Sequence, residues 1–354
     1  MHTALRIALA GLALAAAAPA FAGESATLVR IDAANVELDA RAVRPVSVWI
    51  SSDTRIDDSD TRAALPDTAG RLELAIPASE RRYVILRDAD GHDTVVTERS
   101  VALQQGSNFR DVGGYATRDG RTVRWGKAFR SGAMPMLTEA DYALVRQLAV
   151  DSVVDLRSLD EREVAPDMID DRTGALFISN DYSMKPLMAK ISEGDGENAY
   201  RGIEKTLAPQ YRSLFRRLIA DEGAVVYHCS AGQDRTGIAT ALLYDTLGVD
   251  RETILKDYHL STALRRPEWE MPRIDPKDYP NNLIVQYYFA RSREADARSE
   301  PVRAEPLYTP TGISHLAQFF TYVDQEYGGS EGYLRRELGF ADQDIARLRQ
   351  AMLD

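Results

Sequence analysis

Cysteine is almost absent from this chain of 354 residues, because Cys229 is the only one. A single thiol cannot form an intramolecular disulfide, and no second thiol is available to rescue it from oxidation. We therefore expect a packed core to stabilise the fold. The lack of resolving thiols also disfavours arsenate reduction, one of the reactions in which a cysteine lies in an anion-binding loop.

Histidine and long apolar runs are scarce as well. The chain has five histidines, and His92, His259 and His315 show no metal-ligand spacing with carboxylates or with the cysteine, so we expect no metal and no cofactor. Beyond the N-terminus, no segment approaches the roughly twenty uninterrupted apolar residues of a membrane-spanning helix. We expect no transmembrane segment once the N-terminus has been removed.

Positive charge is in deficit, because the formal net charge is -11. Such acidity argues against nucleic acid as a partner and against anionic membrane surfaces. It does not argue against phosphate, which responds to the local field of the loop that binds it.

The N-terminus has the three parts of a secretory signal peptide. Arg6 provides a basic start, residues 7–18 form an apolar core, and Ala20-Phe21-Ala22 is a small-x-small cleavage site. We predict a signal peptide over residues 1–22, cleavage after Ala22, and a periplasmic or secreted mature protein. An uncleaved anchor is the alternative.

Residues 23–101 are predicted to form a small all-β sandwich domain. Turn signals such as Asp90-Gly91 separate short runs rich in β-branched residues. Trp49 is expected in its core, and the role of the domain is open: it could dock onto the rest of the chain, bind a partner or aid folding. The predicted strands are residues 27–31, 46–50, 72–76, 83–86 and 94–97.

Residues 102–354 alternate helical and strand-like patterns. Helical spacing is present over 138–148, where Thr138 is a helix-start signal, and over 200–220, and a final amphipathic helix follows Ala341; residues 150–156 form an apolar strand-like run. We predict an α/β domain in which helices flank both faces of a central sheet.

One loop of this domain carries the chemistry. A buried strand is predicted over 223–228 and a helix over 238–247, so the segment between them joins a strand end to a helix start. In that segment, five residues separate Cys229 from Arg235. Unpaired amide groups and the positive end of a helix dipole meet at such a junction, where they favour both a phosphoryl group and a thiolate.

Four residues of this loop have expected roles. Cys229 would be the thiolate nucleophile, and the planar guanidinium of Arg235 would hold two phosphoryl oxygens through the transition state. Thr236 could donate a hydrogen bond to the sulfur, and His228 would orient the loop. A buried structural cysteine is the alternative. The remaining residues of the predicted phosphate-binding loop are Ser230, Ala231, Gly232, Gln233 and Gly237.

The Cys229-x5-Arg235-Thr-Gly string resembles the signature of cysteine-dependent protein tyrosine phosphatases. Further motifs resemble the bacterial tyrosine/serine phosphatase family, which includes secreted phosphatases of mycobacteria and Listeria. The resemblance covers residues 106 to 354 and implies a cysteine-phosphatase-like sheet and hydrolysis of phosphate esters through a phosphocysteine. These motifs are Asn108-Phe-Arg-Asp-Val-Gly-Gly-Tyr115, Phe129-Arg-Ser-Gly132, Asp155-Leu-Arg157 and Tyr327-Gly-Gly-x-Glu-Gly-Tyr333.

The family also implies a helical lid or insertion around the site. Residues 181–198 and 264–303 are the candidate segments. Four side chains in them are candidates for a substrate entry, with ordinary packing as the alternative: Tyr182, Lys185, Tyr287 and Tyr288.

Two aspartates are candidates for the general acid that protonates the leaving oxygen. Asp234 lies in the loop, where members of the resembled family use an aspartate. Asp155 ends a predicted strand, where open α/β sheets place their sites, but it could instead pair with Arg157 and brace the loop. We favour Asp234. Arg157 and Arg130 are expected to add positive field, contact substrate or act structurally.

The expected substrate is phosphotyrosine in a phosphorylated protein or peptide. Many relatives carry lysine where this chain has Gln233, and in the family that lysine is associated with activity on phosphoinositides. Glutamine supplies no charge, which weakens the case for a lipid headgroup. Phosphoserine, a phosphoinositide and a broad range of phosphomonoesters remain alternatives, and a non-catalytic phosphate-binding module is a further one.

Overall fold

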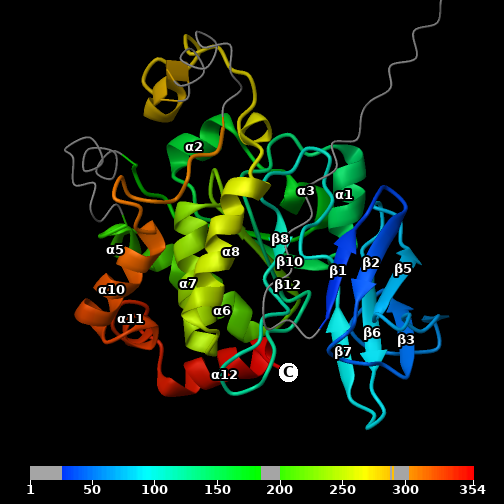
Figure 1. The fold of residues 1–354 in the computed structure, drawn as a ribbon. Helices are drawn as coiled ribbons and strands as arrows, with labels where there is room; N and C mark the ends of the chain where they lie inside the picture. The colour runs from blue at the N-terminus through cyan, green and yellow to red at the C-terminus, as the bar shows by residue number, and fades with distance from the viewer. Residues whose placement is uncertain (1–25, 185–199, 288, 291–302) are drawn as a thin grey trace, which may run out of the picture.

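The computed structural model describes residues 26–184, 200–287, 289–290 and 303–354. The predicted signal peptide therefore lies outside the described residues. An all-β part and a larger part with helices around a sheet lie side by side (Figure 1). None of the helices in the described ranges is long and apolar enough to cross a membrane.

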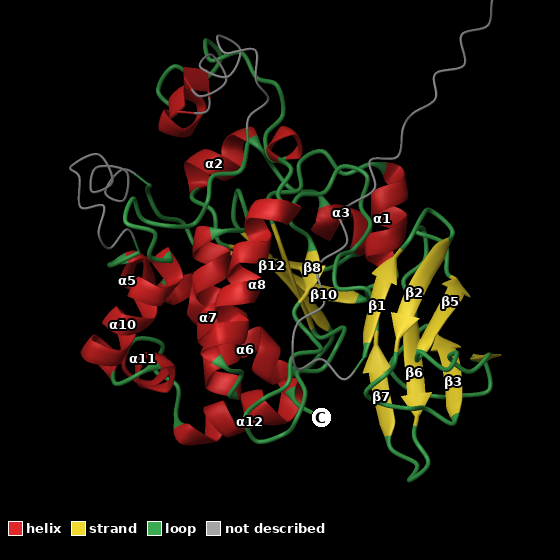
Figure 2. Ribbon diagram, in the orientation of Figure 1, coloured by secondary structure: helices red, strands yellow, loops and turns green. Residues whose placement is uncertain are grey.

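The N-terminal part is a sandwich of two antiparallel sheets (Figure 2). Val36 and Leu38 of one sheet and Val48 and Leu86 of the other are fully or almost fully buried in a shared core. The predicted β-sandwich is thus confirmed. One sheet contains β1 (Thr27–Arg30), β2 (Asn35–Asp39) and β5 (Arg71–Ala75), and the other contains β4 (Thr61–Ala63), β3 (Ser47–Ser51), β6 (Tyr83–Arg87) and β7 (Asp93–Val96).

The prediction that Trp49 lies in this core is wrong. Side chains alternate between the two faces of a strand, and in β3 it is Val48 that points into the core. Trp49 is only half-buried, and the guanidinium of Arg62 lies 5.8 Å from its ring centroid.

The C-terminal part is built on a five-stranded sheet in the order β11-β10-β12-β9-β8. The first four strands pair in parallel, and only β8 is antiparallel to its neighbour. Apolar β-branched residues explain the central strands, because parallel strands are covered on both faces. The bounds are β8 (Arg110–Asp111), β9 (Ala128–Ser131), β10 (Val150–Asp155), β11 (Leu176–Ser179) and β12 (Ala224–His228).

Helices cover both faces of this sheet, which confirms the predicted α/β architecture. On one face, α1 (Glu139–Arg146) and α3 (Ile169–Thr173) pack on Val153 and Val226. On the other face, α6 (Ala208–Ala220), α7 (Asp234–Leu247) and α12 (Asp342–Met352) share a core with Val154 and Val225. The remaining helices are α2 (Leu159–Val164), α5 (Ile203–Thr206), α8 (Arg251–Leu264), the 3-10 turn η1 (Pro267–Trp269), α10 (His315–Tyr327) and α11 (Ser330–Arg336).

The helix predicted over 200–220 is divided into α5 and α6. Leu207 precedes α6 with non-helical backbone angles, and Pro209 occupies the first turn of α6. Proline has no amide hydrogen for a helical bond and is tolerated only in a first turn, so a new helix begins there.

The β-sandwich docks onto the sheet domain through a buried ion pair. The Nη2 of Arg81 lies 2.7 Å from Oδ2 of Asp111 in β8. The amide of Arg81 also donates to Oε1 of Gln147, just after α1. Asp111 belongs to one of the motifs singled out in the sequence, so the β-sandwich contacts the part of the chain that carries those motifs.

Candidate active site

The cysteine loop leaves the carboxyl end of β12, in the middle of the parallel sheet. His228 pairs in register with Asp155 of β10 on one side and with Ser131 of β9 on the other. The loop runs from Cys229 to Gln233, and α7 begins at Asp234. The helix thus begins four residues earlier than predicted, and Asp234 and Arg235 lie in its first turn.

Outward hydrogen bonds fix the orientation of the loop peptides. The carbonyl of Ser230 accepts from the amide of Ala133 at 2.8 Å, and the side-chain amide of Asn108 donates to the carbonyls of Ala231 and Gly232 at 3.1 and 3.0 Å. In a trans peptide the carbonyl and the following N–H point in opposite directions. The amides after these carbonyls therefore face the inside of the loop.

The inward amides make no hydrogen bond to any described residue; they belong to Ala231, Gly232 and Gln233. Amides of buried backbone are nearly always paired. A run of unpaired donors at the start of a helix is a ready-made anion site, because the helix dipole adds to the effect.

Gly232 is required by the tight course of the loop. Its φ is +65°, in the left-handed region, and an added Cβ would lie 2.4 Å from the carbonyl oxygen of Ser131. No other residue fits here without moving β9, since the clash is with backbone.

Cys229 begins this loop and Arg235 lies in the first turn of α7, and both are more enclosed than an open phosphate pocket requires. Cys229 is only 1% exposed. The guanidinium of Arg235 faces Glu161, and its Nη1 and Nη2 donate to the two carboxylate oxygens at 2.7 and 2.6 Å. Nη1 also donates to the hydroxyl of Tyr182 at 2.7 Å.

Glu161 is a site residue that sequence reasoning missed. Its carboxylate accepts hydrogen bonds from the amide and hydroxyl of Ser158 at 2.9 and 2.8 Å, and from the hydroxyl of Ser230. Burial alone would raise the pKa of Glu161, but Arg235 and these hydrogen bonds hold that pKa at about 2. A capping-box spacing, Ser158-x-x-Glu161 directly after a strand end, is the signal that could have found it.

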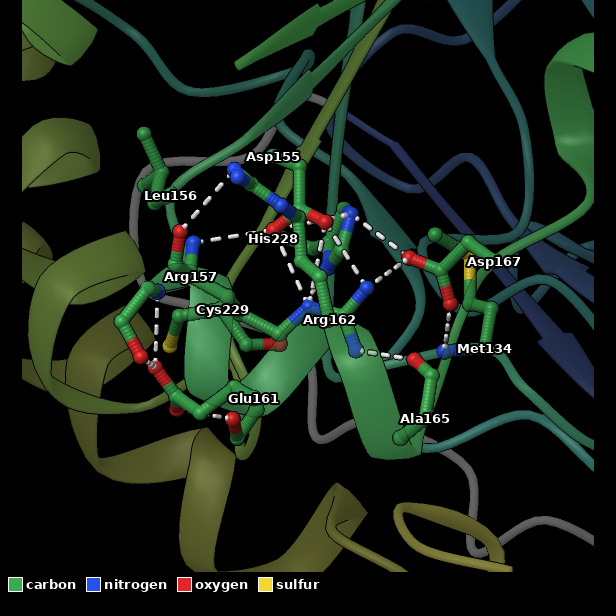
Figure 3. A network of polar contacts seen from close by, with 12 residues as sticks. Met134, Asp155, Leu156, Arg157, Glu161, Arg162, Ala165, Asp167, His228 and Cys229 are labelled. Atoms are coloured by element: carbon green, nitrogen blue, oxygen red, sulfur yellow. Dashed lines mark hydrogen bonds and ion pairs between the residues drawn. The ribbon is translucent and has the colours of Figure 1, made fainter. Parts of the chain in front are cut away.

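A network of buried charges lies behind the loop (Figure 3). Arg157 donates to both oxygens of Asp155, and its Nη2 lies 2.9 Å from Oδ2 of Asp167. The Nε2 of His228 lies 2.8 Å from the same oxygen. Both oxygens of Asp155 thus bind Arg157. This pairing is the structural role that the sequence analysis gave as the alternative to a general acid.

The direction in which the pKa of His228 is shifted follows from this network. Burial alone would lower the pKa of His228, but Asp155 and Asp167 outweigh it and raise the pKa above its ordinary value. Asp167 itself has a pKa of about 2, because Arg157 and His228 oppose the effect of burial. Both side chains that face Asp155 and Asp167, those of Arg157 and His228, thus brace the end of β12 from which the loop leaves.

Arg130 lies beneath the loop in a second cluster. Its Nη1 and the guanidinium of Arg110 share one carboxylate, Asp257, at 2.8 and 3.2 Å, and all three residues are fully buried. Arg130 also donates to the carbonyl of Gly232 at 2.9 Å. Two guanidinium groups on one carboxylate leave one positive charge under the loop, which strengthens the field for an anion. Arg130 thus supports the loop from below.

Asp234 and Gln233 of the predicted loop have hydrogen-bond partners, whereas the hydroxyl of Thr236 has none among the described residues. Asp234 is half-buried at the end of the loop, and its Oδ1 accepts from the hydroxyl of Tyr200 at 2.5 Å. Gln233 is buried, and its Oε1 accepts from Arg265. Thr236 is also buried, but its hydroxyl has no partner among the described residues. The predicted hydrogen bond from Thr236 to the sulfur is therefore not formed.

Of the four candidate entry residues, Tyr182 contacts the site through Arg235. Tyr287 is 44% exposed. Lys185 and Tyr288 lie outside the described residues.

Two groups in the described ranges bring metal-type ligand atoms within 4.8 Å of one another. Asp155, Asp167 and His228 form one, but the guanidinium of Arg157 already supplies its positive charge. Asp88, Asp90 and His92 form the other, on an exposed turn between β6 and β7. The expectation that His92 has no carboxylates at ligand spacing is therefore wrong, because the turn gathers them. Exposed acidic clusters are common without a metal, so this one does not establish a metal site.

Comparison with known proteins identifies the family. The model of the tyrosine phosphatase family matches residues 101–354. A tyrosine-protein phosphatase of Nostoc commune is 28% identical over 62% of this chain and 72% of its own length. The triple specificity protein phosphatase PtpB of Mycobacterium tuberculosis is 29% identical over 70% of this chain and 96% of its own.

Among solved structures, TpbA from P. aeruginosa matches with 18% sequence identity and a TM-score of 0.27. The match covers 48% of this chain and 90% of the TpbA chain. The family match spans the whole sheet domain with its cysteine loop. The chain belongs to the tyrosine phosphatase family.

Proposed function

We propose that this tyrosine phosphatase is an exported enzyme that hydrolyses phosphotyrosine in proteins through a phosphocysteine intermediate. The observation that carries the proposal is the convergence of inward amides, Arg235 and Cys229 in one loop, with Asp234 at its end. These are the groups that an in-line displacement at phosphorus needs: a nucleophile, a charge clamp and an acid.

The proposed reaction has two steps. The sulfur of Cys229 attacks phosphorus, the bond from phosphorus to the phenolic oxygen breaks, and Asp234 gives its proton to that oxygen. Water then attacks the phosphocysteine, Asp234 takes a proton from the water, and the bond between sulfur and phosphorus breaks to release inorganic phosphate. The amides and Arg235 hold the phosphoryl oxygens in both steps.

Arg235 can serve this role while it stays bound to Glu161. The carboxylate takes one hydrogen from each terminal nitrogen, and the Nε–H and the second Nη2–H have no acceptor among the described residues. A guanidinium offers five donors in a fixed fork, so the edge formed by Nε and Nη2 remains for two phosphoryl oxygens.

Access to the sulfur requires movement of side chains above the loop, because Cys229 is buried. Tyr182 is our candidate, since its hydroxyl bridges Arg235 and the carbonyl of Leu156. Substrate binding would displace Tyr182 and break its hydrogen bond from Nη1 of Arg235, while the phosphate binds at the edge formed by Nε and Nη2.

Turnover of para-nitrophenyl phosphate tests the chemistry. We expect activity from the wild type and none from Cys229→Ser, because a hydroxyl at this position is a far poorer nucleophile than a thiolate. Equal activity of the two proteins would refute the proposal. Iodoacetamide can modify only one thiol in this chain, and phosphate or vanadate should protect it.

A substrate panel tests the class of phosphate ester. Phosphotyrosyl peptides, phosphoseryl peptides, phosphoinositides and nucleotides would be compared by kcat/KM. We expect phosphotyrosyl peptides to be preferred, and a preference for any other class would contradict that part of the proposal. Export is tested separately: N-terminal sequencing of the protein from the periplasm or medium should begin at Gly23.

A further inference from the structure

Asp234 ends a chain of buried hydroxyl groups that lies outside the cysteine loop. The hydroxyl of Tyr200 donates to its Oδ1 at 2.5 Å, and the hydroxyl of Tyr258 in α8 contacts that of Tyr200. Tyr200 is 3% exposed and Tyr258 is 1% exposed. Neither tyrosine belongs to the motif that identified the site.

The number of hydroxyl hydrogens decides which tyrosine donates and which accepts. A phenol has one O–H, and that of Tyr200 is used by Asp234. Tyr258 must therefore donate to Tyr200. Burial, with Asp234 next in effect, raises the pKa of both phenols above the ordinary value, so both stay neutral donors at neutral pH.

Packing fixes both rings in place. They meet edge to face, with centroids 6.4 Å apart and an interplanar angle of 87°. Gly237 of the loop motif makes this possible, because a Cβ at this position would lie 2.9 Å from Cδ2 of Tyr258. The glycine after Thr236 thus lets Tyr258 approach the first turn of α7.

We infer that Tyr200, held by Tyr258, is a positioning residue for the general acid Asp234. This inference rests on the proposed function. The hydroxyl of Tyr200 occupies Oδ1 and fixes the carboxyl plane, while Oδ2 has no partner among the described residues. The catalytic proton is therefore carried on Oδ2, the oxygen left to face the leaving group, and Tyr200 keeps its own proton throughout.

The test compares two substrates, one whose leaving group needs a proton and one whose leaving group does not. Tyr200→Phe removes the hydroxyl and keeps the buried ring. We expect kcat/KM for phenyl phosphate to fall by about 10- to 100-fold, part of the 10²- to 10⁴-fold that a positioned acid contributes. For 2,4-dinitrophenyl phosphate, whose leaving group departs as a stable anion, we expect the wild-type kcat/KM, because this quantity does not include the hydrolysis of the phosphocysteine. Tyr258→Phe should show the same selectivity to a smaller extent.

Tyr244→Phe is the matched control. Tyr244 is a fully buried tyrosine of the same helix as Asp234, and its hydroxyl donates to the carbonyl of Val112. It should leave the ratio of the two kcat/KM values unchanged. If Tyr200→Phe lowers both kcat/KM values equally, its role is merely structural and the inference is overturned.

Two further variants separate this inference from the proposed function. Asp234→Asn should reproduce the selectivity of Tyr200→Phe with a larger loss. If it does and Tyr200→Phe has no effect, the inference fails while Asp234 stands as the acid. If Asp234→Asn shows no selectivity while Cys229→Ser is inactive, both the acid assignment and the inference fall, and the nucleophile stands. Activity of Cys229→Ser would overturn the proposed function itself.

Discussion

The carboxylate of Glu161 holds the guanidinium of Arg235 end-on, with each terminal nitrogen within 2.7 Å of a different oxygen. The two residues are far apart in sequence, on α2 and at the start of α7. Their pairing fixes the plane of the guanidinium before any phosphate arrives, so little reorganisation is needed in the transition state.

Glu161→Gln should weaken this alignment without emptying the site. The amide keeps one acceptor for Arg235 but loses the charge and the symmetric fork. We expect kcat/KM for para-nitrophenyl phosphate to fall by up to about 10²-fold, the size of effect that small misplacements cause. Steady-state kinetics with circular dichroism as a folding check would measure it. An unchanged kcat/KM would show that Glu161 does not orient Arg235.

Stability should depend on pH through three buried carboxylates. The pKa values of Glu161, Asp167 and Asp257 are each about 2 in the folded protein, below their ordinary values. Groups of this kind stabilise the fold above the unfolded-state pKa, and this stability is lost as the pH falls toward the folded-state value. We expect the free energy of unfolding to fall by about 4 kcal/mol between pH 5 and pH 3.

Urea unfolding at several pH values would measure this decrease. Glu161→Gln provides the internal comparison, because it removes one of the three carboxylates. Its free energy of unfolding should be lower at pH 7 and should change less between pH 5 and pH 3. An identical pH dependence in variant and wild type would contradict the assignment.

The loop should not tolerate a side chain at position 232. Gly232→Ala adds a Cβ 2.4 Å from the carbonyl of Ser131 at a φ of +65°, so the loop amides must shift and activity should be lost. Gly91→Ala is the control: its φ is +86°, yet nothing lies within 4 Å of the added Cβ. That variant carries the conformational cost of a positive φ, about 1 kcal/mol, and should keep full kcat/KM.

The sequence predicted the elements that depend on local patterns. The strand ending at His228, the cysteine loop and the following helix all lie in one continuous segment, so spacing alone placed Cys229 and Arg235 together. The alternation of apolar and polar residues also predicted the β-sandwich. The prediction missed β2 and β4, and it put Trp49 on the wrong face of β3.

Residues that reach the site from distant segments were not predictable in this way. Glu161, Asp257 and Tyr200 each contact the loop or its supports only because the fold brings α2, α8 and the segment that precedes α5 together around the loop. Spacing within a segment can mark a residue such as Glu161 through its capping box, but it does not encode the contact with a distant residue. Asn108 was noted as part of a motif, but its two hydrogen bonds to loop carbonyls follow only from the fold.

Asn108→Ala should therefore separate activity from stability. It removes both donors that turn the carbonyls of Ala231 and Gly232 outward, so the amides of the next residues lose their fixed direction. The φ of Asn108 is +57°, a conformation that asparagine tolerates better than alanine, which adds a small stability cost. We expect kcat/KM to fall by about 10²-fold with only a modest decrease in Tm. Asn108→Gly removes the same donors without the backbone strain. If it retained full activity, the side-chain amide would not be what orients the loop.

Arg81→Met should test whether the β-sandwich is tied to the site through Asp111. The variant leaves Asp111 as a buried carboxylate without its partner, and losing one member of a buried ion pair costs about 3 to 5 kcal/mol. Asp111 also accepts from the amides of Gly113 and Gly126, so the damage should reach the motif that carries Asn108. We expect a lower free energy of unfolding and a lower kcat. Arg81→Met combined with Asp111→Asn should recover part of the stability, because no unpaired charge is then buried. If the double variant were as unstable as the sum of the single variants, the two side chains would be independent and the docking contact would lie elsewhere.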